Sequence, residues 1–263
     1  MHAQEFLVSG LLLLTTTLSS LTTACDPASG DASPLTFGPS EYPPLETIGW
    51  NVNHFSLFPH DLAASKHFYI DILGMREIFT YAMVPGKFEV IYLGYPSGGR
   101  NGSGYQTPQE MFREKNNMQG LLEFVWIAPD ATNPPREKPV ASTEKSNTFS
   151  HLGLIVPDMT VARKRIIDAG VKVLVDVGSN GDEPLDHPIM NAYGFSLIPP
   201  LPKYADLRRE AIKALVASGG NTYLIIEDPD GNMVEVQPRD EAAEHLERPP
   251  AGQDSTGRDR DEL

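Results

Sequence analysis

Four side chains could together bind a metal ion: His54, Glu123, His151 and Glu235. Each His lies in a short β-prone run and each Glu in a later one, so each half of the chain contributes one imidazole and one carboxylate. An unpaired carboxylate is costly to bury, and a metal ion would balance both charges. Two imidazoles and two carboxylates that converge suit a divalent transition metal. The alternative is a structural His–Glu hydrogen bond in each half.

The residues around the two histidines repeat with an offset of 97 positions. In both copies a Leu lies three positions after the His, and Asp residues lie 7 and 17 positions after it. Asp61 and Asp158 are placed to cap a helix N-terminus. Gly74 and Gly170 can adopt the left-handed conformation that ends a helix. Each copy therefore opens as a strand followed by a helix.

Further strands are expected after each helix, at residues 87–93, 121–127, 222–227 and 233–237. The segment Asp228-Pro229-Asp230-Gly231 predicts a tight turn between the last two strands. Strand alternation directs Glu123 away from Leu122, Phe124 and Trp126, which are large enough to pack under a helix. The sequence predicts an α+β fold of two βαβββ modules.

An insertion at roughly residues 179–220 interrupts the second copy. Within it, one helical face is expected to carry Leu207, Ala211, Ala214 and Leu215, and Gly219-Gly220 ends that helix. Two roles fit the insertion equally: a helix packed on the outside, or a lid over a site. Residues 128–148 contain Pro134-Pro135, lack periodicity and link the two copies.

Both ends of the chain resemble targeting signals. Residues 1–24 resemble a secretory signal peptide, with a membrane anchor or a lipoprotein acylated at Cys25 as the alternatives. The C-terminal residues 260–263 resemble an endoplasmic-reticulum retrieval signal, and Asn101-Gly102-Ser103 is a glycosylation sequon. We therefore expect the secretory pathway, either the lumen of the endoplasmic reticulum or secretion, with residues 25–47 a linker and 239–263 a disordered tail.

Composition excludes several classes of function. The 263 residues carry 35 Asp and Glu against 21 Lys and Arg, a net charge of −14, which disfavours nucleic-acid binding. The single cysteine, Cys25, excludes an intramolecular disulfide framework and a Cys-rich zinc module. Because Cys25 lies at the predicted cleavage point, site chemistry in the folded domain must come from His and carboxylate side chains.

Residues 48–238 resemble the vicinal-oxygen-chelate superfamily, and within it glyoxalase I (lactoylglutathione lyase). The resemblance is carried by His54, Asp61-Leu62, Phe68-Tyr69, Leu73-Gly74-Met75, Leu122-Glu123, His151, Pro157-Asp158, Asp228-Pro229-Asp230-Gly231 and Glu235. It implies modules at residues 48–127 and 149–238 that form a U-shaped sheet around a metal. It also maps the metal ligands onto His54, Glu123, His151 and Glu235.

The resemblance implies a metal-dependent lyase or isomerase that stabilises an enediolate, with Glu235 as general base and Glu123 as second base or ligand. Zn²⁺ or Ni²⁺ is favoured, with Fe, Co or Mn as alternatives. The family's glutathione-binding Arg and Asn are replaced by Asp71 and Ile127, so we expect a small carbonyl-derived substrate other than the usual glutathione hemithioacetal.

Two other functions share this fold. An extradiol-type Fe(II) dioxygenase uses two His and one carboxylate, and Glu123, as a fourth ligand, argues against it. A non-catalytic small-molecule-binding protein, like the bleomycin-resistance proteins, typically lacks the ligands that are intact here. A homodimer is compatible with the fold, and no stable membrane insertion is expected once the signal peptide is cleaved.

Overall fold

The computed structural model describes residues 38–39, 44–97, 106–129, 137–184, 186–199, 201, 204–217 and 219–239. The predicted signal peptide, Cys25, the sequon and the retrieval signal lie outside these residues and stay predictions. The chain divides into two units, Met1–Trp50 and Asn51–Leu263. In the first unit, the described residues include one short 3-10 helix, η1, Leu45–Thr47. No helix in the described part of the chain has the length and apolar character needed to cross a membrane.

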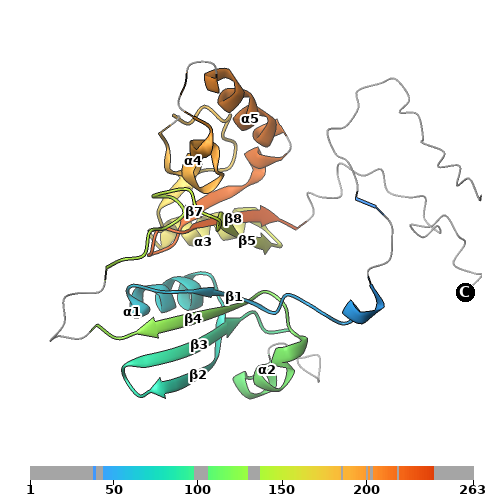
Figure 1. Cartoon of the computed structure of the whole chain (residues 1–263), viewed down its shortest axis with the longest axis vertical. Helices are drawn as coiled ribbons and strands as arrows, with labels where there is room; N and C mark the ends of the chain where they lie inside the picture. Colours follow the sequence, from blue (N-terminus) through green and yellow to red (C-terminus); the bar gives the residue numbers. More distant parts are fainter. Residues whose placement is uncertain are drawn as a thin grey trace, which may run out of the picture. The chain divides into compact units, whose positions relative to one another are not determined.

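The first module forms a four-stranded sheet in the order β1-β4-β3-β2 (Figure 1). Its strands are β1 (His54–Leu57), β2 (Arg76–Val84), β3 (Phe88–Gly94) and β4 (Leu121–Ile127). Between β1 and β2, α1 (Leu62–Lys66) continues as the π-helical turn η2 (His67–Ile72). A helical excursion joins β3 to β4, formed by α2 (Pro108–Glu114) and η3 (Lys115–Asn117).

The second module repeats this topology, with strand order β5-β8-β7-β6. Its strands are β5 (His151–Val156), β6 (Val173–Val175), β7 (Leu224–Glu227) and β8 (Met233–Pro238). Its helices are α3 (Met159–Asp168), α4 (Pro188–Ala192), η4 (Phe195–Leu197), α5 (Ala205–Ala217) and η6 (Gly220–Thr222). The α+β class and the two βαβββ modules are therefore confirmed. The expected strands match β3, β4, β7 and β8, whereas β2 and β6 were not located from the sequence.

The local signals act as predicted. Asp61 accepts a hydrogen bond from Ala64 N at 3.0 Å, and Asp158 accepts one from Val161 N at 3.0 Å. These two side chains cap α1 and α3 by satisfying amide groups of the first turn. Gly231 N donates to Asp228 O at 3.0 Å, closing the tight turn between β7 and β8. Gly231 has φ of 94° and its Cα faces Ala141 so closely that an added Cβ would clash.

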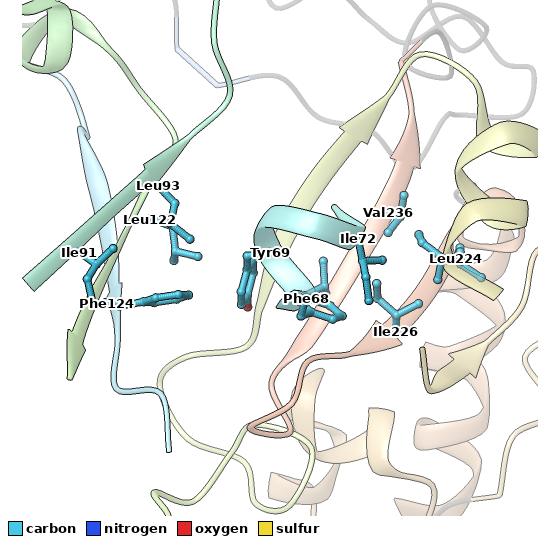
Figure 2. Packing of buried hydrophobic residues seen from close by; sticks show 12 residues of the cluster. Phe68, Tyr69, Ile72, Ile91, Leu93, Leu122, Phe124, Leu224, Ile226 and Val236 are labelled. Atoms are coloured by element: carbon cyan, nitrogen blue, oxygen red, sulfur yellow. The ribbon is translucent and has the colours of Figure 1, made fainter. Parts of the chain in front are cut away.

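The helical segment α1–η2 contacts both sheets. Figure 2 shows Tyr69 directed toward Phe124 of β4, while Phe68 lies toward Ile226 of the second sheet. These residues belong to one buried apolar cluster drawn from both modules. The Tyr69 hydroxyl donates to the buried Asp228 carboxylate at 2.8 Å, which adds a polar contact between the modules. Leu122 and Phe124 are thus on the helix-facing side, as strand alternation predicts.

The insertion covers the opposite face of the second sheet. In α4, Ile189, Met190 and Ala192 are buried against Ile225 and Met233. The segment is fixed by hydrogen bonds, because Asn191 donates to the carbonyl of Thr143 at 2.9 Å and its own carbonyl accepts from Ser146. The predicted helix is confirmed as α5. The expected apolar face is wrong in detail, because Ile212, which lies outside that face, is buried and Leu207 is exposed.

Candidate functional site

The first half-site lies on β1 and β4 of the first sheet. The parallel pairing of these strands places Ser56 beside Glu123 and His54 beside Leu121. His54 Nε2 is 3.9 Å from Glu123 Oε2, and the Ser56 hydroxyl donates to Glu123 Oε1 at 2.9 Å. The carboxylate therefore turns one oxygen toward the imidazole and has the other held by a hydroxyl.

The second half-site repeats this arrangement on β5 and β8. The register places Gly153 beside Glu235 and His151 beside Met233. His151 Nε2 is 3.9 Å from Glu235 Oε1, and Glu235 Oε2 accepts a hydrogen bond from the Tyr193 hydroxyl at 2.5 Å. Gln237 also donates to Glu235 Oε1. Glu235 is buried, although it carries a carboxylate, because both of its oxygens have donors.

A tyrosine completes each half-site and was missed by the sequence analysis. The rings of Tyr92 and His54 meet edge-on at 5.2 Å and 64°, and those of Tyr193 and His151 at 5.7 Å and 64°. Burial, followed by the nearby Glu123 or Glu235, raises the pKa of each phenol well above its usual value. Both phenols therefore stay protonated and can donate hydrogen bonds at neutral pH.

The two tyrosines reach their half-sites by different routes. Tyr92 is on β3, in register with Glu123, so strand alternation could have revealed it. Ile225 occupies the corresponding position beside Glu235 on β7. Tyr193 comes instead from the end of α4, in the insertion, and nothing in the repeat predicts it. The insertion supplies to the second half-site a group that the sheet supplies to the first.

The separation within each His–Glu pair is close to that of two neighbouring ligands on one metal ion. A gap of 3.9 Å between nitrogen and oxygen is longer than a hydrogen bond. Neighbouring ligands on a metal with bonds of about 2.0–2.2 Å lie about 2.8–3.6 Å apart, so each pair would close slightly on binding one ion. Imidazole nitrogen with carboxylate oxygen is a donor set that divalent transition metals accept. The donor types therefore suit a metal of this class, and each module offers two of them.

The structure gathers the predicted ligands in pairs. Among the described residues, no group of three or more His, Cys, Asp or Glu side chains is close enough to hold one metal ion. A cavity of about 810 Å³ lies between the start of β4 and β5, with His151 in its lining together with Phe55, Leu122, Leu154 and Arg239. Of the four predicted ligands, His151 alone lines this cavity.

The chain matches the sequence profile of the Glyoxalase/Bleomycin resistance protein/Dioxygenase superfamily over residues 51–187, just over half of its length. The chain therefore belongs to that superfamily, which is the vicinal-oxygen-chelate superfamily that its motifs resemble. The match includes His54, Glu123 and His151 and ends within the insertion, before Glu235. None of the curated proteins matches the chain.

Solved structures of several kinds resemble the chain. The trypanothione-dependent glyoxalase I of Leishmania major is 15% identical, with 74% of this chain and 91% of that one covered and a TM-score of 0.39. An antibiotic-binding protein from a Streptomyces species is 16% identical, with 72% and 95% covered and a TM-score of 0.34. A glyoxalase/dioxygenase from Nostoc punctiforme is 18% identical, with 77% and 98% covered and a TM-score of 0.37.

Proposed function

We propose that this protein is a metal-dependent lyase or isomerase that forms an enediolate from a small α-hydroxycarbonyl substrate. The observation that carries the proposal is the repetition of one His–Glu pair, with the same 3.9 Å separation, in both modules. A bound Zn²⁺ or Ni²⁺ would stabilise the negative charge that develops on two adjacent substrate oxygens. His54, Glu123, His151 and Glu235 would hold it.

The protein's own carboxylates would move the proton. Loss of a proton from carbon next to a carbonyl needs a general base, and Glu235 and Glu123 are the candidates within the two half-sites. Hydrogen bonds from Tyr193 and Gln237 fix the orientation of the Glu235 carboxylate. A hydrogen bond from Ser56 fixes that of the Glu123 carboxylate. These hydrogen bonds hold each carboxylate in a defined position within its half-site.

The chemistry around Asp71 supports a substrate other than the glutathione hemithioacetal. Where glyoxalase I has a glutathione-binding Arg, this chain has Asp71, whose exposed carboxylate lies 2.9 Å from His67 Nδ1. An acidic side chain would repel a glutathione carboxylate. Ile127, which is exposed, offers no hydrogen bond in place of the family's Asn.

We further propose that the two half-sites of different copies meet in a homodimer to complete the metal site. Each half-site is incomplete, because the described part of one chain holds its ligands only in pairs. β1 and β5, which carry the histidines, each lie at an edge of their sheet. Exposed apolar side chains flank these edges, with Phe55 and Phe58 near His54 and Ile155 near His151. An edge strand with exposed apolar residues is suited to bind a second chain.

Proton exchange on simple model compounds tests the activity. The protein is loaded with Zn²⁺ or Ni²⁺ and incubated in D₂O with dihydroxyacetone, hydroxyacetone and the glutathione–methylglyoxal hemithioacetal. We expect the α-protons of the simple hydroxyketones to exchange faster than in a matched solution of Glu235→Gln. No exchange with any compound would contradict the enediolate proposal, and O₂ uptake with catechol by protein loaded with Fe²⁺ would favour a dioxygenase.

A further inference from the structure

A polar residue directly precedes each histidine. It contacts Nδ1, the ring nitrogen that is not paired with a glutamate. His54 Nδ1 lies 3.0 Å from Asn53 Oδ1, and His151 Nδ1 lies 2.7 Å from Ser150 Oγ. The position of the ring proton therefore depends on whether these oxygens accept or donate. The other hydrogen bonds of Asn53 and Ser150 determine whether each side chain accepts from the imidazole or donates to it.

The Ser150 hydroxyl has one hydrogen, and a carbonyl of the insertion takes it. Ser150 Oγ lies 2.5 Å from the carbonyl oxygen of Ala192, at the end of α4, and a carbonyl can only accept. Toward His151 the same oxygen must then act as acceptor, so His151 carries its proton on Nδ1. The lone pair of Nε2 is left free on the side of Glu235.

The Asn53 amide leads to the same result by another route. Its Nδ2 donates to two carbonyls, that of Lys115 at 2.7 Å and that of Met118 at 2.9 Å. Both contacts require the amide nitrogen, which fixes the orientation of the side chain. Oδ1 therefore faces His54 Nδ1 as acceptor, and His54 also carries its proton on Nδ1. The two carbonyls belong to η3 and its following residue, in the excursion between β3 and β4.

We propose that Asn53 and Ser150 are positioning residues that hold both histidines in the tautomer with Nδ1 protonated and Nε2 available as a metal ligand. The carbonyls that set these residues come from the two excursions that cover the sheets, η3 with Met118 in the first module and α4 in the second. The insertion is thus part of the metal site, because Ala192 sets the tautomer of His151 and Tyr193 holds Glu235. This inference rests on the proposed metal site.

The loss of such a partner has a measurable consequence. A histidine binds metal through an unprotonated nitrogen, so the wrong tautomer must convert before it can bind. Removing the group that fixes a ligand's second nitrogen typically lowers metal affinity about 10–100-fold. Ser150→Ala removes the acceptor, and Ser150→Thr retains the hydroxyl.

The test combines long-range ¹H–¹⁵N NMR of the imidazoles in the metal-free full chain with Zn²⁺ affinity measured by chelator competition. His187 is the internal reference, because its Nδ1 accepts the backbone N–H of Ile189 and so its proton is on Nε2. We expect the opposite tautomer for His54 and His151. Ser150→Ala should lose this tautomer at His151 alone and bind Zn²⁺ about 10–100-fold more weakly, and Ser150→Thr should retain both properties.

Two outcomes separate this inference from the proposed function. If His151 keeps the Nδ1 proton in Ser150→Ala, or Zn²⁺ affinity is unchanged while the wild type binds Zn²⁺, the inference is overturned and the proposed function stands. If the wild type shows both Nδ1–H tautomers but binds no Zn²⁺ or Ni²⁺, the tautomer assignment is supported and the proposed metal site fails. Asn53→Ala, tested in the same way, should change the tautomer of His54 alone.

Discussion

The two modules place the same His–Glu pair with the same separation but support it with different residues. In the first module, the supporting groups Ser56 and Tyr92 belong to the sheet itself. In the second, Gly153 and Ile225 occupy those register positions, and Tyr193 from the insertion and Gln237 hold the carboxylate. The comparison shows that the strand register places the His–Glu pairs, whereas the residues that hydrogen-bond to them come from the sheet in one module and partly from the insertion in the other.

The half-sites also differ in how deeply they enclose their carboxylates. The Glu235 side chain is 7% exposed and that of Glu123 is 17% exposed. A more deeply buried carboxylate loses more hydration and depends more on its partners. We therefore expect the second half-site to be the more sensitive to substitution.

The largest effect is expected from neutralising the carboxylates. Glu235→Gln keeps the shape of the side chain but removes the proton acceptor, so proton exchange from a hydroxyketone substrate should fall about 10²–10⁴-fold. Some metal should remain, since three ligands are unchanged. The measurement is the exchange rate in D₂O together with metal content. Glu123→Gln should cause a smaller loss, because that carboxylate is less enclosed.

Glu89→Gln is the matched control for these variants. Glu89 is on β3 and pairs with Trp126, on the sheet face opposite to Glu123. It should leave both metal content and exchange unchanged. If Glu235→Gln behaves like Glu89→Gln, Glu235 has no role in the site.

Removing the tyrosine hydroxyls should lower metal affinity more in the second half-site than in the first. Tyr193→Phe takes away the donor to Glu235 Oε2 and should weaken Zn²⁺ binding about 10–100-fold. Tyr92→Phe should cost less, because Ser56 still holds Glu123. Chelator competition measures both affinities.

The first module suggests a rescue for Tyr193→Phe. Gly153 has the register position of Ser56, and a Cβ added there would meet no atom within 4 Å. Gly153→Ser should therefore fit, offer Glu235 a hydroxyl and restore part of the affinity. A double variant no tighter than Tyr193→Phe would show that the two half-sites are not interchangeable.

The contact between the modules can be tested through stability. Tyr69→Phe removes the donor to Asp228, whose carboxylate is buried and also accepts from the backbone and side chain of Asn232. We expect a loss of about 1–3 kcal/mol in the free energy of unfolding, measured by urea denaturation. Tyr95→Phe is the control, because the exposed Tyr95 hydroxyl donates to the Leu73 carbonyl. Equal losses in both variants would contradict a special role for the Tyr69–Asp228 bond.

The smallest effect on stability is expected from removing an ion pair, and each module has one such pair. Lys66 of α1 pairs with Glu77 of β2 at 2.9 Å, and Arg163 of α3 pairs with Asp176, after β6. Burial raises the pKa of Glu77, but hydrogen bonds from Thr80 and Lys66 lower it by more. The hydrogen bond from Arg163 is the main cause that lowers the pKa of Asp176.

Both carboxyl pKa values are therefore lower in the folded state than in the unfolded chain. The stability from each pair is fully present above the unfolded value, near 4.5 for Glu and 3.8 for Asp, and is lost as the pH falls through the folded value. Lys66→Met should cost less than about 1 kcal/mol at neutral pH, because the pair is partly exposed. It should also flatten the acid side of the stability profile. Arg163→Met should do the same with a smaller effect, and a steeper acid limb would contradict this account.

Much of the fold could be predicted because its signals are local. The capping Asp61 and Asp158, the glycines that end the helices and the turn before β8 each depend on neighbouring residues. The two His–Glu pairs could be predicted because strand alternation and the 97-residue repeat together define the faces on which these residues lie. Asn53 and Ser150 carried a usable signal, since a polar residue precedes the His in both copies.

The remainder depends on contacts between distant segments. Tyr193 could not be predicted, because the insertion has no counterpart in the first module and its path over the sheet follows from packing of Ile189 and Met190. The face of α5 was misjudged for a similar reason, since the helix carries apolar residues on more than one face and its packing partner decides which face is buried. The separation of the four residues into two His–Glu pairs also follows from the packing of whole modules.

Mixing two complementary variants tests the central claim, that the His–Glu pairs of both modules together hold one metal ion. One variant carries His54→Ala and Glu123→Gln, and the other carries His151→Ala and Glu235→Gln. Each alone should contain no stoichiometric Zn²⁺ or Ni²⁺ by elemental analysis, whereas the wild type should contain one ion per chain. After unfolding and refolding together, the mixture should regain metal, because a mixed dimer has one intact pair from each copy. Stoichiometric metal in either variant alone, or none in the wild type, would contradict the account.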